Sequence, residues 1–433
     1  MDCELIMQML HDEGCKDASV VWMSNTGEQV KLIGGEIDQL QRSNSQAAAL
    51  NLFIEGRQGF FYTNELDTDS LRSFVRRAVE TTRLLVPDEA RSLADPSRYY
   101  RGGGADLCNF DYALATLTTQ ECIHLAQASH LEVMEAGHPA LVSVETRYSD
   151  NVYQARFLIS NGFSAEEQST RCTLSDIVSV RGEGEARPMD GWGQTRLFFQ
   201  DMPRQGIGKL ALERSLRKIG QRPASSGHYT MVVESPVADQ LLQPLLGAMN
   251  GNMLQQHLSF LEGCMDKPVG SPLLHLVDEP HIPGTRGASY FDFDGVATER
   301  RVLFDRGVLR TWFIDTPASR RLQLPPTTTG IHHCRLEAGA KDLEQTLAGL
   351  DRCILVTDFN GGNCNPTTGD FSYGIEGFLY EHGVIVQPVS GMNITGNMFT
   401  LWQNLVEVAD DADPYERMLI PSLVFEDVAF SGV

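Results

Sequence analysis

The sequence predicts an α+β fold with two domains, and three observations lead to this prediction. First, 433 residues are too many for one hydrophobic core, because single cores stop growing at about 250–300 residues. Second, the first half alternates amphipathic helical patterns with strand-like runs. Third, residues 221–227 are rich in proline, serine and glycine, and short strands with tight turns follow them. We therefore expect an N-terminal α+β domain over residues 1–220 and a mostly antiparallel, β-rich domain with a few helices over residues 221–433.

The N-terminal domain is predicted to begin with a helix. Leu5, Ile6, Met9 and Leu10 fall on one helical face, and Gly14 is a natural stop. The triplet Asn25-Thr26-Gly27 predicts a turn between two strands. The strand-like runs on either side of this turn and after it occupy residues 18–23, 30–33, 47–54 and 60–63.

Further helices and strands complete this domain. Asp69 or Ser70 can cap one helix, and Thr118 with Glu121 fits the capping box of a second. A third helix is expected over residues 204–219. The remaining strand-like runs occupy residues 141–148, 155–160 and 172–180. Helices packed on a twisted antiparallel sheet are therefore expected.

Two hairpins with the same pattern are predicted in the second domain. The strand-like runs 301–304 and 377–380 are each followed by a three-residue turn that ends in glycine, at Gly307 and Gly383. Glycine supplies the positive φ that a tight hairpin needs. Paired strands of this kind indicate a mostly antiparallel architecture.

The charge balance argues against a nucleic-acid partner. Lys and Arg number 35 against 57 Asp and Glu, which gives a formal net charge of −22. Such a surface repels phosphate backbones unless it carries a strong local basic patch. The densest basic stretch, residues 214–222, is interpreted as a solvated helix face.

The cysteine pattern and the hydropathy predict a cytoplasmic protein. The nine cysteines are widely spaced and include no CxxC pair, which is typical of reduced thiols. The start of the chain lacks the basic and apolar segments of a signal peptide. There is no run of about 18 apolar residues, so no membrane partner is expected.

No intact motif of a common hydrolase or nucleotide-dependent enzyme is present. The sequence contains no HExxH, HExxxH, GxSxG or GxxxxGK[ST] pattern. His332, His333 and Cys334 have ligand chemistry, but adjacent side chains of an extended segment point to opposite faces. Asp292 and Asp294 share a face of an extended run and could bind a cation, although a solvated strand edge is favoured.

One loop stands out by its density of turn formers and hydroxyls, the stretch NPTTGDFS at residues 365–372. A rigid loop with many donors and acceptors can contact a peptide or shape a cavity. It can equally be a turn that is hydrogen-bonded within itself, and the sequence leaves both interpretations open. The candidate side chains are Asn365, Thr367, Thr368, Asp370 and Ser372.

This stretch resembles the NPxTGDxS signature of the PmbA branch, also called TldE, of the TldD/PmbA family. The segments GF at 377–378, EHG at 381–383, PVS at 388–390 and ITGN at 394–397 resemble the family's GF, ENG, PVS and IAGN elements in order and spacing. DFDGVAT at 292–298 and DRG at 305–307 are similar to its DxEGxxT and ENG elements. The resemblance spans most of the chain and is strongest from about residue 285 to 400.

The resemblance implies a two-domain α+β fold and a role in proteolysis. In this family the TldD branch supplies a zinc site from an HExxxH helix and a distant C-terminal cysteine. The PmbA branch pairs with it in a complex that degrades or trims peptides. The family's other name, modulator of DNA gyrase, comes from a genetic link and does not imply direct binding.

The resemblance also implies that this chain has lost the metal site. Gln243 replaces the first histidine, Pro244 the general-base glutamate, and Ala248 the second histidine. A Gln amide is a poor zinc ligand, alanine has no donor atom, and proline cannot act as a base. Pro244 is also expected to kink the helix unless it lies in the first turn. No cysteine follows Cys364, and Ser422 lies about where the ligand cysteine would be.

These features predict a non-catalytic subunit of a cytoplasmic metalloprotease, with no cofactor of its own and zinc only in a TldD-type partner. Its expected role is to shape the chamber and help bind a peptide substrate, by strand addition at a sheet edge. Three alternatives stay open. One is a metal-free homodimeric interaction or regulatory protein of the gyrase-modulator type, and another is a diverged enzyme with a new site at 365–372 or 332–334. Direct DNA binding is the last.

Overall fold

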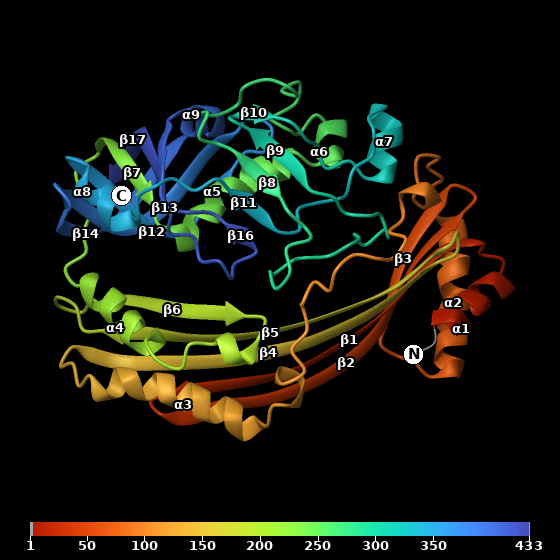
Figure 1. The fold of residues 1–433 in the computed structure, drawn as a ribbon, viewed down its shortest axis with the longest axis horizontal. Helices are drawn as coiled ribbons and strands as arrows, with labels where there is room; N and C mark the ends of the chain where they lie inside the picture. Colours follow the sequence, from red (N-terminus) through yellow and green to blue (C-terminus); the bar gives the residue numbers. More distant parts are fainter. Residues whose placement is uncertain (1–2, 433) are drawn as a thin grey trace.

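Three β-sheets organise residues 3–432, the part of the chain that this computed structural model describes. Figure 1 shows the N-terminal sheet as a long curved layer beneath the C-terminal half. Its strands have the order β3-β2-β1-β4-β5-β6. They are β1 (Asp17–Ile33), β2 (Glu36–Ile54), β3 (Arg57–Thr63), β4 (Leu141–Ile159), β5 (Phe163–Val180) and β6 (Met189–Arg196).

The turn predicted at residues 25–27 is wrong, because β1 continues through it as a single strand. Asn25 pairs with Ser45 on β2 and with Tyr153 on β4. A Cβ atom at Gly27 would lie 2.4 Å from the backbone oxygen of Asp150, so this glycine allows β4 to approach closely rather than reversing the chain. The runs 141–148 and 155–160 likewise belong to one strand, β4.

Four helices of the N-terminal half pack on this sheet. Asp67, and not Asp69 or Ser70, caps α2, since its Oδ1 accepts the Ser70 N–H at 3.0 Å. The predicted capping box of Thr118 and Glu121 is confirmed at the start of α3. Figure 1 shows α1 and α2 at one end of the sheet, and α3 and α4 towards the other. Their bounds are α1 (Cys3–Asp12), α2 (Thr68–Leu84), α3 (Thr119–Glu135) and α4 (Ile207–Arg217).

The largest C-terminal sheet has the order β14-β13-β12-β7-β17-β15, and β14 also pairs with β17, so the sheet partly closes on itself. Only the β7–β12 pair is parallel within it. The remaining pairs are antiparallel. Its strands are β7 (Gly227–Val233), β12 (Arg352–Cys364), β13 (Asp370–Glu381), β14 (Val384–Asn397), β15 (Leu405–Val408) and β17 (Leu423–Gly432).

A smaller sheet and five helices complete the C-terminal half. The predicted hairpins are both present, and Gly307 and Gly383 have φ of 80° and 77° in their turns. The small sheet contains β8 (Leu276–Asp278), β9 (Arg301–Asp305), β10 (Val308–Leu309), β11 (Cys334–Leu336) and β16 (Met418–Leu419). The helices are α5 (Ser235–Ala248), α6 (Gly251–Gln255), α7 (Thr316–Leu322), α8 (Leu343–Ala348) and α9 (Met398–Gln403).

The predicted α+β class is confirmed. The boundary predicted at residue 220 falls between α4 and β7. Across residues 3–432, no helix combines the length and apolar character needed to cross a bilayer. Met1 and Asp2, at the chain start considered above, lie outside the described residues.

Candidate functional site

The first turn of helix α5 is bonded to Ser422, a serine from the C-terminal part of the chain. The Ser422 hydroxyl accepts the backbone N–H of Ser235 at 3.0 Å, and it donates to Asp411 Oδ2 at 2.6 Å. The Ser422 N–H also donates to Asp411 Oδ1 at 2.7 Å. Ser422, which stands near the family's cysteine position, therefore holds the first turn of α5.

Gln243, Pro244 and Ala248, the residues that the resemblance places at metal-ligand positions, lie in the second half of α5. Pro244 is the tenth of fourteen helical residues, so it lies in the helix interior and cannot donate to the carbonyl of Gln240. Gln243 is exposed and its Nε2 lies 3.6 Å from Met418 Sδ. Ala248 is buried. The C-terminal side chain that reaches Gln243 is thus a thioether rather than a thiolate.

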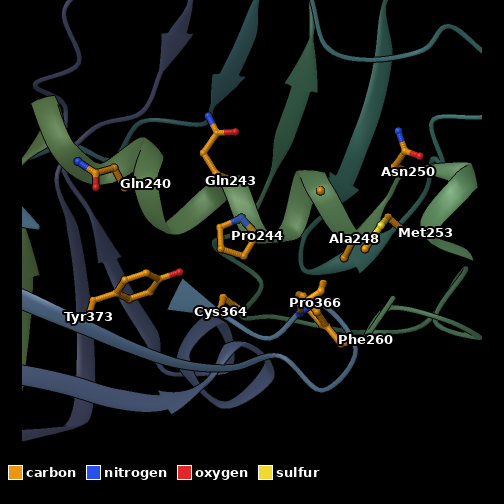
Figure 2. A pocket seen from close by; sticks show the side chains of 11 residues that line it. Gln240, Gln243, Pro244, Ala248, Asn250, Met253, Phe260, Cys364, Pro366 and Tyr373 are labelled. Atoms are coloured by element: carbon orange, nitrogen blue, oxygen red, sulfur yellow. The ribbon is translucent and has the colours of Figure 1, made fainter. Parts of the chain in front are cut away.

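A cavity of about 590 Å³ lies between this part of α5 and the start of the β12–β13 loop. Figure 2 shows Pro244 and Ala248 on the side of the helix that faces Cys364 and Pro366, while Gln243 extends the other way. The structure therefore places Pro244 and Ala248 next to the loop that the sequence singled out. The cavity is lined by Gln240, Gln243, Pro244, Gly247, Ala248, Asn250, Met253, Phe260, Cys364, Pro366 and Tyr373.

The loop at 365–372 is held together by its own side chains and by Asn397. Asn365 Oδ1 accepts the Thr367 N–H at 2.9 Å, and the Thr368 hydroxyl donates to Asp370 Oδ2 at 2.7 Å. Asn397 Nδ2 donates to the carbonyl of Thr368 at 2.8 Å and to Asp370 Oδ1 at 2.9 Å. These bonds from Asn397 and Thr368 hold the pKa of Asp370 below its ordinary value. The interpretation as an internally bonded turn describes this loop correctly.

The loop also forms part of the cavity wall, so the two interpretations of its sequence are compatible. Pro366 lines the cavity, and its carbonyl accepts the N–H of Phe260 at 2.8 Å. Gly369 has φ of 80°, and a Cβ there would lie 3.2 Å from the Phe260 ring. The candidate side chains Asn365, Thr368 and Asp370 bond within the turn. The cavity lining contains none of the five candidates Asn365, Thr367, Thr368, Asp370 and Ser372, and their neighbours Cys364 and Pro366 line it instead.

Two ionisable side chains of this cavity, Cys364 and Tyr373, have raised pKa values. Burial raises the pKa of the Cys364 thiol, and Asp370 adds to that effect, so the thiol is protonated and a weak nucleophile near neutral pH. Burial raises the pKa of Tyr373 to about 12. Within residues 3–432, no group of three or more His, Cys, Asp or Glu side chains is arranged to hold a metal ion. The side chains of Gln243, Pro244 and Ala248 are an amide, a proline ring and a methyl group, and they do not form a set of zinc ligands.

A second and larger cleft of about 1170 Å³ separates β6 from the C-terminal half. One wall is β6, the edge strand of the N-terminal sheet, and the opposite wall includes the first turns of α5 and residues 411–418. Gln243 lines both this cleft and the smaller cavity. The walls of this cleft lie far apart along the chain, so no local sequence pattern predicts it.

The basic stretch at 214–222 is only partly the solvated face that its sequence suggested. Arg217 and Arg222 are exposed, but Arg214 and Lys218 are not. Arg214 forms two hydrogen bonds of 2.9 Å with the carboxylate of Glu234. Lys218 is only 3% exposed and lies 3.2 Å from Asp190 and 2.9 Å from Glu376. Burial alone would lower the pKa of Lys218, but these two carboxylates outweigh it and raise that pKa. The ion pairs join α4 and β6 to the C-terminal sheet beside the cleft.

Asp292 and Asp294 do not form the solvated strand edge expected from the sequence. Asp292 is 7% exposed, and its Oδ1 accepts the N–H groups of Asp294 and Val296 at 3.0 Å. Burial raises the pKa of both carboxyl groups, and it raises the pKa of Asp294 to about 6.

The N–H groups of His332 and His333 both donate to Asp278 Oδ1. The histidine pair therefore takes part in a buried turn.

Comparisons with known proteins cover the whole fold. Models described as PmbA/TldA metallopeptidase domain 1, central domain and C-terminal domain match residues 18–82, 112–219 and 226–432. The metalloprotease PmbA of Escherichia coli O157:H7 is 25% identical over 423 residues, which cover 96% of this chain and 92% of that protein.

Solved structures give the same result. A protein described as a candidate modulator of DNA gyrase from Bacteroides thetaiotaomicron is 44% identical, with a TM-score of 0.97 and coverage of 100% of this chain and 98% of that one. TldE from Thermococcus kodakarensis shares the fold at 19% identity, with a TM-score of 0.87 and 99% coverage of both chains. With three matched domains and a likeness that extends from end to end, this chain belongs to the PmbA/TldD metallopeptidase family.

Proposed function

We propose that this chain is a PmbA-type subunit of a cytoplasmic two-component metalloprotease, in which a TldD-type partner carries the zinc. The chain itself completes the substrate chamber and helps to hold an unfolded peptide. In this proposal the chain divides near residue 220, and the cleft between β6 and the C-terminal half faces the chamber.

The observation that supports this role most directly is the composition of the α5 cavity. Gln243, Pro244 and Ala248 stand where the family's ligands and base are expected, and they leave no zinc donor set and no base there. The cavity nevertheless persists as a formed space with largely apolar walls, which is the usual character of a binding site. A site that keeps its shape without its catalytic groups is what a substrate-holding subunit requires.

The free edge of β6 supports a peptide-binding role. β6 pairs only with β5 and its residues line the cleft. Side chains of Asp190, Arg196 and Lys218 bond to backbone groups of Gly191, Thr195 and Met189, and an added strand would have to displace them. An extended peptide added there would be recognised through backbone hydrogen bonds, with little dependence on its side chains. Gly191 and Gly193 of β6 also line the cleft. A Cβ at these positions would lie 2.9 Å from Asp176 and 2.7 Å from Ser175 on β5, so both glycines allow β5 to approach closely.

The test is to mix this chain with a TldD-type subunit from the same organism and to measure co-elution and cleavage of an unfolded peptide. We expect a stable complex, cleavage by the mixture that a chelator abolishes, and no cleavage by this chain alone. A bound metal would stabilise the folded chain, and a chelator would then lower its melting temperature. We expect the isolated chain to bind no metal, so a chelator should leave its melting temperature unchanged. Chelator-sensitive hydrolysis by the pure chain, with tightly bound zinc, would contradict the proposal.

Backbone recognition needs its own measurement. Methylating alternate backbone nitrogens of the peptide removes the donors on one side of a strand, so one of the two alternating patterns should weaken binding while the other is tolerated. A matched peptide of the same composition in scrambled order should bind about as well as the original. Equal loss from both methylation patterns, or strong dependence on side-chain order, would argue against strand addition.

A further inference from the structure

The large cleft between β6 and the C-terminal half has acidic walls. Eight Asp and Glu residues and four arginines line it, with no lysine or histidine among the lining residues. All four arginines are engaged by other groups of the chain, in the pairs Arg196–Asp413, Arg214–Glu234 and Arg286–Glu416 and in a bond of 2.8 Å from Arg417 to the carbonyl of His332. The arginines therefore have partners before any ligand binds.

Two carboxylates of the cleft have no basic partner in the described part of the chain. These are Asp239 of α5 and Asp358 of β12, and both side chains are half-buried. Lys218 bonds at 2.9 Å to Glu376, which lies directly across from Asp358 on β13, rather than to Asp358 itself. A half-buried charge that has lost hydration and gained no partner lowers the stability of the fold. Such local costs occur mainly at functional sites.

The two carboxylates lie at a place in the fold that binding sites often use. β7 and β12 form the one parallel pair of their sheet, and this pairing ends at Val233 and Val356. Thr357 and Asp358 follow directly on β12, while α5, which carries Asp239, follows β7. Both carboxylates therefore lie beyond the carboxyl ends of parallel strands, as ligand-binding residues do in open α/β sheets.

Thr357 gives a second, independent sign of a ligand. This residue is 5% exposed and lines the cleft, yet its Oγ1 has no hydrogen-bond partner in the described chain. Buried polar groups are nearly always hydrogen-bonded, so an unpaired one calls for an explanation. An ammonium or guanidinium group carries several N–H donors, so one that pairs with Asp358 can also donate to this neighbouring oxygen.

We propose that the large cleft binds peptides that carry lysine or arginine, with Asp239 and Asp358 as the carboxylates that receive the cationic side chains and Thr357 as a further acceptor beside Asp358. This preference rests on the proposed function, in which the cleft faces the substrate chamber, and it adds the charge of the substrate. Opposite charges steer an encounter and select among partners. The net charge of −22 acts in the same direction.

Matched peptides test the role of charge. A fluorescent, unfolded peptide with two arginines is compared with the same peptide carrying citrulline or glutamate at both positions, and its binding is followed by anisotropy. Citrulline keeps the shape of arginine and removes its charge. With the full chain, alone and in complex with a TldD-type subunit, the arginine peptide should bind on the order of tenfold more tightly than the citrulline peptide. The difference should shrink as salt is added.

Amide variants assign the preference to the two carboxylates. Asp239→Asn and Asp358→Asn should each reduce the preference for arginine over citrulline by about threefold. Neither should lower the melting temperature, because each removes a charge that has no partner. Asp410→Asn is the matched control, since Asp410 is exposed and adjoins the cleft without lining it, and it should keep the full preference.

The possible outcomes separate charge selection from the peptide-holding role. Equal binding of the arginine and citrulline peptides, or a preference that survives both amide variants, would overturn charge selection and leave the peptide-holding role intact. An equal loss in Asp410→Asn would assign the preference to the overall charge of the chain and overturn the site. Failure of all three peptides to bind the chain or the complex would overturn both proposals.

Discussion

The guanidinium carbon of Arg196 lies 3.8 Å from the centre of the Tyr415 ring. Arg196 ends β6 and is 5% exposed, and Tyr415 belongs to the segment before β16. Arg196 Nη1 also lies 3.6 Å from Asp413 Oδ2. This contact joins the edge of the N-terminal sheet to the opposite wall of the large cleft, and it sets the width of the cleft at that end.

Removing either partner of this contact should loosen the cleft. Arg196→Lys keeps the charge but loses the planar stacking, and Tyr415→Leu keeps an apolar side chain but loses the ring face. In a double-mutant cycle on unfolding free energies, the coupling should be about 1–2 kcal/mol. Each single variant should also be cut faster by protease within residues 409–417. Strictly additive losses would show that the stacking contributes nothing of its own.

Ser422→Ala should destabilise the chain, because it leaves the Ser235 N–H without its acceptor and removes one of the two hydrogen bonds that Asp411 accepts from residue 422. The expected loss is about 1–3 kcal/mol, the typical result of leaving a buried polar group unsatisfied. Thermal and urea unfolding would measure it. Ser431→Ala, on an exposed position of β17, is the matched control and should change stability by less than about 0.5 kcal/mol. Equal behaviour of the two variants would contradict the role assigned to Ser422.

Asp294→Asn should stabilise the chain at neutral pH and not at acidic pH. Burial and Asp292 raise the pKa of Asp294 to about 6, above its ordinary 3.8. The contribution of a carboxyl group with a raised pKa is fully present below pH 3.8 and is lost as the pH rises through about 6. An amide avoids that loss, so the variant should gain about 1–3 kcal/mol at pH 7.5 and little at pH 4. A gain of the same size at both pH values would exclude this cause.

Gly247 offers a way to fill the α5 cavity without straining the helix. A Cβ at this position meets no atom within 4 Å. Gly247→Ala should therefore stabilise the chain by about 0.5–1 kcal/mol through helix propensity alone. Gly247→Phe places a ring in the cavity and should fold equally well, but it should reduce peptide binding by the complex at least tenfold relative to Gly247→Ala. Unchanged peptide binding in the Phe variant would remove the cavity from the proposed function.

Local patterns predicted the elements that depend on neighbouring residues. The capping box at Thr118 and the positive φ of Gly307 and Gly383 are set within a few residues of the chain, and each is present. Asn25 to Gly27 misled for a physical reason, because a glycine that admits a neighbouring strand has the same local signature as a glycine in a turn. Only pairing with β4, more than 120 residues away, distinguishes the two.

Sequence patterns suggested candidate residues for the site, but the residues that form its walls could not be predicted. Gln243, Pro244 and Ala248 were recognisable from a family motif that they fail to match. Lys218 was not recognisable, because its partners Asp190 and Glu376 come from β6 and β13 and become neighbours only in the folded chain. A buried lysine and a solvated lysine look alike in a sequence until the carboxylates that surround them are known.

The position of β7 in the middle of its sheet has a consequence for the order of folding. Val232 pairs with Leu355 on one side and with Val424 on the other. At a synthesis rate of about 5–20 residues per second, a ribosome needs roughly 10–40 s after making β7 before β17 exists to cover it. During that interval the edge of β7 that later pairs with β17 remains unpaired. We therefore expect a growing chain to expose the β17 side of β7 until residues 423–432 have been made.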